Sequence, residues 1–146
     1  ADEKTKTLKL EFASTVDALG PWLAAEPWKD EKALKVYAVK LADLVRAGKT
    51  DAWAKEAAPK YEQLGKAFGV EAAMLSNSER VAMQDFKKLP ALKAGDVVVE
   101  PLLGGRLFRL RHSKHPKALF VMKTKDEERA FEVIVGAVDG ALRVVR

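Results

Sequence analysis

The hydrophobic pattern of the chain changes its period at Ala94-Gly95. Before this point, apolar residues recur every three or four positions, the period of one face of an α-helix. After it, alternating and β-branched residues dominate, which is typical of β-strands. Because helices followed by strands favour an α+β arrangement, the sequence predicts a helical part over residues 1–93 and an antiparallel sheet over residues 94–146.

Size and composition limit the classes of protein that fit. A length of 146 residues is enough to bury one core, so we expect both parts to form a single domain. The chain is cysteine-free, which excludes thiol nucleophiles, disulfide frameworks, zinc–thiolate sites and iron–sulfur clusters. No apolar run approaches the roughly 18–20 residues that cross a bilayer, so no transmembrane segment is expected.

About four helices are predicted before Pro90. Each has an apolar stripe of helical period, and a glycine or a proline, the residues that interrupt helices, ends or kinks it. The stripes are Leu8, Phe12, Val16, Leu19 and Leu23; Leu34, Ala38, Leu41 and Val45; Trp53, Ala57, Tyr61, Leu64 and Phe68; and Ala82, Phe86 and Leu89.

Several residues mark the predicted helix starts. Pro27 and Asp30 begin the second helix, and Thr50 or Asp51 can cap the third by accepting a backbone N–H. The run Ser76–Glu79 has the spacing of a capping box for the fourth helix. Pro59 lies inside the third stripe, which indicates either a kink or a short turn before a helix with Pro59 in its first turn.

The residues after Gly95 predict a five-stranded antiparallel β-meander in sequence order. Gly104-Gly105 and Asp139-Gly140 are typical of hairpin turns. Pro101 places the first strand at a sheet edge, because proline has no N–H for a ladder bond. The predicted strands are Asp96–Leu103, Arg106–His112, Lys117–Thr124, Arg129–Gly136 and Ala141–Arg146.

The predicted turns imply a pairing register. A two-residue loop at Gly104-Gly105 puts Glu100 opposite Arg109, and a loop over Ser113–Pro116 puts Arg109 opposite Phe120. Both faces of such a sheet are apolar, which is unusual for an antiparallel sheet with one face in water. We expect other parts of the chain to cover the second face; a second copy of the chain or an apolar ligand would also cover it.

Positive charge is concentrated near the second of these turns. Residues 91–146 hold 11 Lys/Arg against 7 Asp/Glu, whereas residues 1–90 hold 15 against 14. The stretch Arg106–Lys125 contains both histidines and no Asp or Glu. We predict that the loop Ser113–Pro116 and its flanks bind an anionic group or protein surface. The residues predicted to bind are Arg111, His112, Lys114, His115 and Lys117.

No catalytic residue, metal site or cofactor is predicted. His112 and His115 have H-x-x-H spacing, but their neighbours are cationic and would repel a divalent ion, so we interpret them as loop histidines. The sequence has no P-loop, no G-x-G-x-x-G after a strand and no H-E-x-x-H. A non-enzymatic protein is therefore expected, although carboxylates distant in sequence can still meet in a fold.

Three functions fit these observations. The first is an exported, periplasmic or secreted binding module; the chain begins with Ala1 and lacks an initial methionine, as after removal of a signal peptide or trimming of a longer chain. The second, which also suits a cytoplasmic protein, is a nucleic-acid-binding domain with Phe108 and Phe120 as stacking residues beside the arginines. The third is a structural homodimeric subunit.

Overall fold

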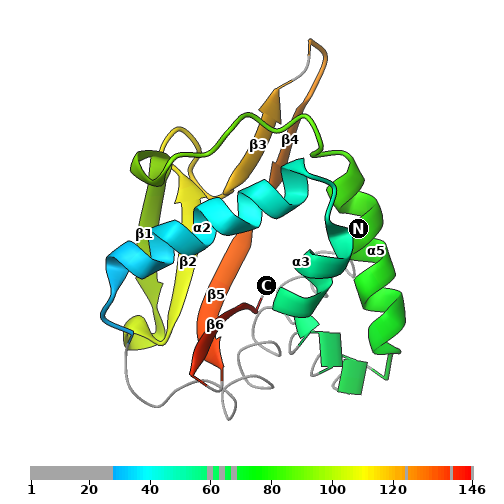
Figure 1. The fold of residues 1–146 in the computed structure, drawn as a ribbon, viewed down its shortest axis with the longest axis horizontal. Helices are drawn as coiled ribbons and strands as arrows, with labels where there is room; N and C mark the ends of the chain where they lie inside the picture. The colour runs from blue at the N-terminus through cyan, green and yellow to red at the C-terminus, as the bar shows by residue number, and fades with distance from the viewer. Residues whose placement is uncertain are drawn as a thin grey trace, which may run out of the picture.

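The computed structural model describes residues 28–58, 61–62, 65–66, 69–123, 125–138 and 140–145. Within these ranges the chain forms three α-helices, a four-stranded antiparallel sheet and a two-stranded antiparallel sheet (Figure 1). The predicted α+β class is confirmed, whereas the predicted five-stranded meander is wrong. The first predicted stripe, Leu8 to Leu23, lies outside the described residues.

Helix α2, Glu31–Arg46, crosses one face of the four-stranded sheet (Figure 1). It begins next to Asp30, as the sequence predicts, and the Asp30 side chain accepts the backbone N–H of Ala33 at 2.9 Å and caps the helix. Gly48 follows its end with a φ of 69°, a left-handed conformation that glycine adopts without strain. The buried stripe of α2 consists of Leu34, Tyr37, Ala38, Leu41, Ala42 and Val45.

The other two described helices start differently from the prediction. Helix α3, Thr50–Glu56, has Lys49 at its cap position and no side-chain hydrogen bond to the backbone there. Helix α5, Ala72–Gln84, contains Ser76–Glu79 in its interior, so the predicted capping box is wrong. The glutamate of that run instead accepts the indole N–H of Trp53 at 2.7 Å, which joins α5 to α3.

Six strands among the described residues form the two sheets. The four-stranded sheet has the order β1-β2-β5-β6, and the second sheet pairs β3 with β4. Short 3-10 turns, η2 (Ala94–Asp96) and η3 (Leu103–Gly105), flank β1. The strands are β1 Val97–Leu102, β2 Leu107–His112, β3 Phe120–Lys123, β4 Glu128–Phe131, β5 Val133–Val138 and β6 Ala141–Val144.

The β3–β4 hairpin leaves the main sheet and so interrupts the predicted meander (Figure 1). The predicted fourth strand is divided at Glu132: the residues before it pair with β3, and the residues after it pair with β2. Arg109 therefore lies opposite Ile134, whereas the meander put it opposite Phe120. The division allows the rings of the hairpin to pack on the helices while β5 continues the sheet beneath α2.

The local registers agree with the sequence prediction. Glu100 lies opposite Arg109 across β1 and β2, and Val138 lies opposite Ala141, as a two-residue turn between them requires. β1 is an edge strand, as Pro101 indicates. The turn between β1 and β2 differs from the predicted two-residue loop, because it contains the 3-10 turn η3.

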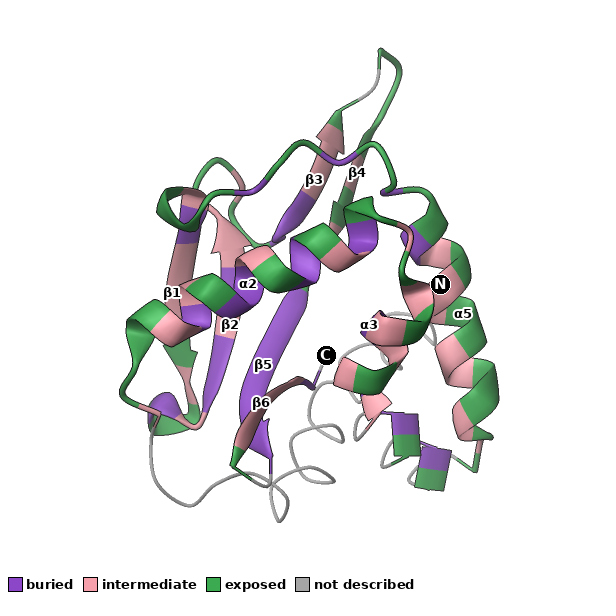
Figure 2. Ribbon diagram, viewed as in Figure 1, coloured by how far each residue is buried: buried purple, intermediate pink, exposed green. Residues whose placement is uncertain are grey.

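Both faces of the four-stranded sheet contain buried apolar side chains, as expected, and the whole of β5 is buried (Figure 2). The face beneath α2 belongs to the main core. The opposite face carries a smaller cluster. Its buried members are Leu107, Ile134, Val138 and Val145.

Four aromatic rings attach the β3–β4 hairpin to the helical part. Trp53 of α3 contacts Phe120 and Phe131 edge to face, each with ring centroids 5.9 Å apart. Phe86, which follows α5, lies 6.4 Å and 6.1 Å from the same two rings. Such pairs are worth about 0.5–1.5 kcal/mol each beyond the area they bury.

A partly buried carboxylate, Glu56, joins α2, α3 and β6. It accepts hydrogen bonds from the Tyr37 hydroxyl at 2.8 Å, from Lys40 Nζ at 2.7 Å and from the Arg143 guanidinium at 3.0 Å. Burial alone would raise the pKa of Glu56, but hydrogen bonds from Lys40 and Tyr37 and the charges of Lys40 and Arg143 outweigh it. The pKa of Glu56 is therefore held below its ordinary value of 4.5.

Replacement Glu56→Gln should destabilise the protein in a pH-dependent manner. Because the folded-state pKa is depressed, the stabilisation is fully present above the unfolded-state pKa and is lost as pH falls through the folded-state pKa. We expect a deficit in unfolding free energy of roughly 1–3 kcal/mol near pH 7 that shrinks toward about pH 3. Urea unfolding of both proteins across this range measures it. Replacement of the exposed Glu62 by Gln is the control, and a deficit independent of pH would contradict the assignment.

Candidate functional site

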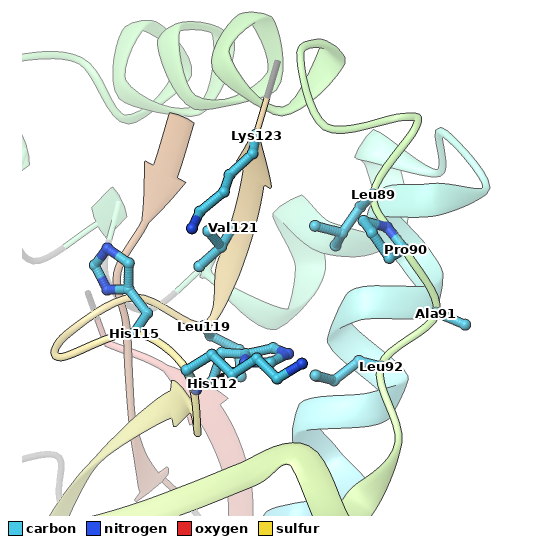
Figure 3. Close-up of a pocket in the computed structure, with 10 residues that line it drawn as sticks. Leu89, Pro90, Ala91, Leu92, His112, His115, Leu119, Val121 and Lys123 are labelled. Carbon is cyan, nitrogen blue, oxygen red and sulfur yellow. Dashed lines mark hydrogen bonds between the residues drawn. The ribbon is translucent and has the colours of Figure 1, made fainter. Parts of the chain in front are cut away.

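The predicted loop lies beside a cavity of about 210 Å³, here called the β3 pocket. One wall is the segment Leu89–Leu92, on the path from α5 to β1; the other wall consists of β3 and the loop that precedes it (Figure 3). The residues that line the β3 pocket are Leu89, Pro90, Ala91, Leu92, His112, Lys114, His115, Leu119, Val121 and Lys123.

The strand β3 divides its side chains between the core and the pocket. Phe120 is fully buried among the aromatic rings, while Val121 and Lys123 line the pocket. Leu119, just before the strand, also lines it, although at 1% exposure it belongs to the main core. This division follows from the two-residue period of a strand, in which successive side chains point to opposite faces. The aromatic packing on one side of β3 therefore holds the pocket wall on the other side in position.

The structure brings three of the five predicted binding residues to the pocket. His112, Lys114 and His115 line it, whereas Arg111 and Lys117 do not. Lys123 joins them, although the meander register, with Arg109 opposite Phe120, would put it opposite Arg106 at the other end of the hairpin. It is included because β3 pairs with β4 and does not run back along β2. That these residues bind a ligand stays a prediction.

Arg111 stabilises the loop from its base. Its Nε lies 2.5 Å from Glu100 Oε1, and its Nη1 donates to the carbonyl oxygens of His115 at 3.1 Å and of His112 at 3.4 Å. The sequence paired Glu100 with Arg109, which does lie opposite, but their closest charged atoms are 3.8 Å apart. Glu100 thus neutralises two arginines and is nearer to the diagonal one.

The imidazole of His115 fixes the backbone of the loop. Its Nδ1 accepts the N–H groups of Lys117 at 3.1 Å and of Ala118 at 2.8 Å. A ring nitrogen that accepts hydrogen bonds carries no proton, so the neutral ring bears its proton on Nε2. This Nε2 lies 3.6 Å from Glu128 Oε1.

His112 and the loop backbone are held in the same manner. His112 Nδ1 accepts the N–H of Lys114 at 3.1 Å, which leaves Nε2 as the donor of the neutral ring. Backbone bonds run from His112 N to Ala118 O at 2.8 Å and from Ser113 N to Asp96 O at 2.7 Å. The loop therefore has a defined shape without a ligand.

The β3 pocket combines apolar walls with a cationic rim. Leu89, Leu92, Leu119 and Val121 contribute the apolar surface, and its charged and polar side chains are two lysines and two histidines. No Asp or Glu is among the lining residues. Such a surface suits a ligand with a negative charge and an apolar part.

A metal ion and a nucleic-acid base would each need side chains arranged in a way that this region does not show among the described residues. The described residues contain no cluster of three His, Asp or Glu side chains arranged to hold a metal ion. Phe108 is 6% exposed and Phe120 is fully buried, so neither ring is available to stack on a nucleic-acid base. Among the same residues, no helix is long and apolar enough to cross a membrane.

Comparison with known proteins provides no relative: no family model, no curated protein and no solved structure matches this chain. The function must therefore be inferred from the chemistry of the β3 pocket.

The role of His115 in the loop can be measured by amide hydrogen exchange. Replacement His115→Leu removes the acceptor of two N–H groups, and we expect the amides of Lys117 and Ala118 to exchange roughly fivefold faster or more. Replacement His115→Asn provides a side-chain oxygen near the Nδ1 position and should retain most of the protection. Equal exchange in the two variants would show that Nδ1 does not hold the loop.

Proposed function

We propose that the chain is a non-enzymatic binding module whose ligand site is the β3 pocket. One observation carries the proposal: the ten lining residues include two lysines and two histidines but no carboxylate. Positive groups around a cavity with low-dielectric walls concentrate the electrostatic field and attract ligands of negative charge. The ligand is therefore an anion.

The loop geometry supports binding by a preorganised site. Arg111 holds two carbonyl oxygens of the loop, and His115 holds two of its N–H groups. Because these bonds order the loop in the free protein, a ligand loses little affinity to the ordering of the loop.

The chemistry of the lining residues also favours binding over catalysis. The pocket contains no serine, threonine, aspartate or glutamate to act as a nucleophile or to orient a catalytic base. Each histidine uses its Nδ1 to accept backbone N–H groups of the loop. These nitrogens are committed to structure, which is consistent with a module that holds its ligand unchanged.

The nucleic-acid and homodimer alternatives use the same region in different ways. A nucleic acid would contact Lys114 and Lys123 through phosphates alone, because Phe108 and Phe120 are buried. Export of the module to the periplasm or outside the cell stays a prediction, as does a dimer. An oligonucleotide therefore belongs among the competing ligands of the test.

Anion binding at the β3 pocket should be visible by NMR titration with acetate, hexanoate, inorganic phosphate and a short oligothymidylate. We expect at least one of them to shift the backbone amides of residues 112–123 and 89–92. Lys114→Gln and Lys123→Gln should each weaken that binding roughly threefold to tenfold, because each removes one partly solvated charge.

Lys117→Gln is the matched control, since Lys117 is exposed on the same loop but does not line the pocket. Its affinity should stay within about twofold of the unmodified protein. The proposal fails if none of the four anions shifts these amides, or if Lys117→Gln weakens binding as much as Lys123→Gln.

A further inference from the structure

We infer that the ligand of the β3 pocket is a free carboxylate with a short apolar tail, such as a fatty acid of about six carbons. This inference rests on the proposed function and specifies the ligand class. Its basis is that the pocket presents two kinds of surface at once, a cationic rim and an apolar wall. Leu89, Leu92 and Leu119 are 6%, 7% and 1% exposed, so only the small open part of the wall is available to a ligand. A purely inorganic anion would satisfy the rim and make no use of that apolar surface.

The apolar wall comes from two separate parts of the chain. Leu89 and Leu92 lie on the segment after α5 and face Leu119 and Val121 across the pocket (Figure 3). An alkyl tail between them would contact aliphatic side chains on both sides. Each methylene buried in this way strengthens binding roughly threefold to fourfold.

The size of the cavity limits the length of the tail. Its volume of about 210 Å³ is below the range of roughly 300–1,000 Å³ for sites that hold drug-sized ligands. With the carboxylate at the rim, a cavity of this size takes a short alkyl tail, and a much longer tail extends beyond it.

The rim favours a single negative charge. Lys123 extends from β3 across the pocket toward His115, as Figure 3 shows, while His112 ends β2 and Lys114 comes from the loop that follows. These groups supply N–H donors to two carboxylate oxygens. Glu128 Oε1 lies 3.6 Å from His115 Nε2 and repels additional negative charge at this edge, which disfavours a phosphate dianion.

The test measures affinity by calorimetry for acetate, butanoate, hexanoate and hexan-1-ol, with inorganic phosphate and oligothymidylate as competitors. We expect affinity to rise roughly threefold to fourfold per methylene from acetate to hexanoate. Hexan-1-ol, which has the tail without the charge, should bind at least roughly tenfold more weakly than hexanoate. Lys123→Gln should weaken all three carboxylates to a similar extent.

Replacement Val121→Thr tests the contribution of the alkyl tail to affinity separately from that of the carboxylate charge. Threonine keeps the shape and the strand propensity of valine but puts a hydroxyl in the apolar wall, so hexanoate should bind roughly threefold to tenfold more weakly, a larger loss of affinity than acetate shows. Val98→Thr is the control, because Val98 is also half-buried in a strand but does not line the pocket. Far-UV circular dichroism verifies that both variants fold.

The outcomes distinguish the ligand class from the proposed function. Equal affinity for acetate and hexanoate, with the pocket amides shifted by both, would contradict the inference that the ligand has an apolar tail, and the proposal of anion binding would stand. Binding of phosphate or of oligothymidylate more tightly than hexanoate would contradict the inference that the ligand is a carboxylate. If no anion shifts the pocket amides, the proposed function itself fails.

Discussion

The contacts among Trp53, Phe86, Phe120 and Phe131 are the interaction on which the rest of this structure depends. A two-stranded hairpin is marginally stable in water by itself, so β3 and β4 need a surface to pack on. The helical part provides that surface through two rings, and the Glu79 carboxylate orients one of them by accepting the indole N–H of Trp53. Packing between distant parts of the chain therefore determines where the hairpin lies.

The β3 pocket is a consequence of this packing. With the inner side chains of β3 in the aromatic cluster, its outer side chains face the segment Leu89–Leu92 and form a cavity with it. Carboxylates elsewhere are already engaged with cations: Glu100 with two arginines, and Glu56 with Lys40 and Arg143. Positive charge consequently collects at the rim of a pocket that has apolar walls.

Features that depend on neighbouring residues were predictable from the sequence. Helix α2 with its start near Asp30, the pairing of Glu100 with Arg109 and the turn between Val138 and Ala141 all follow from short-range patterns. The capping box at Ser76–Glu79 was misleading, because the spacing also occurs inside a helix whose glutamate is used in a tertiary contact.

By itself the sequence determined the α+β class, the position of the basic loop and three of the side chains at the pocket. Only the tertiary structure decided that Lys123 and Leu89–Leu92 join that loop and that Arg111 supports it from below. The physical reason lies in the division of one apolar run at Glu132 between two sheets. Local periodicity is the same for one long strand and for two strands with different partners, and only the packing of distant rings distinguishes them.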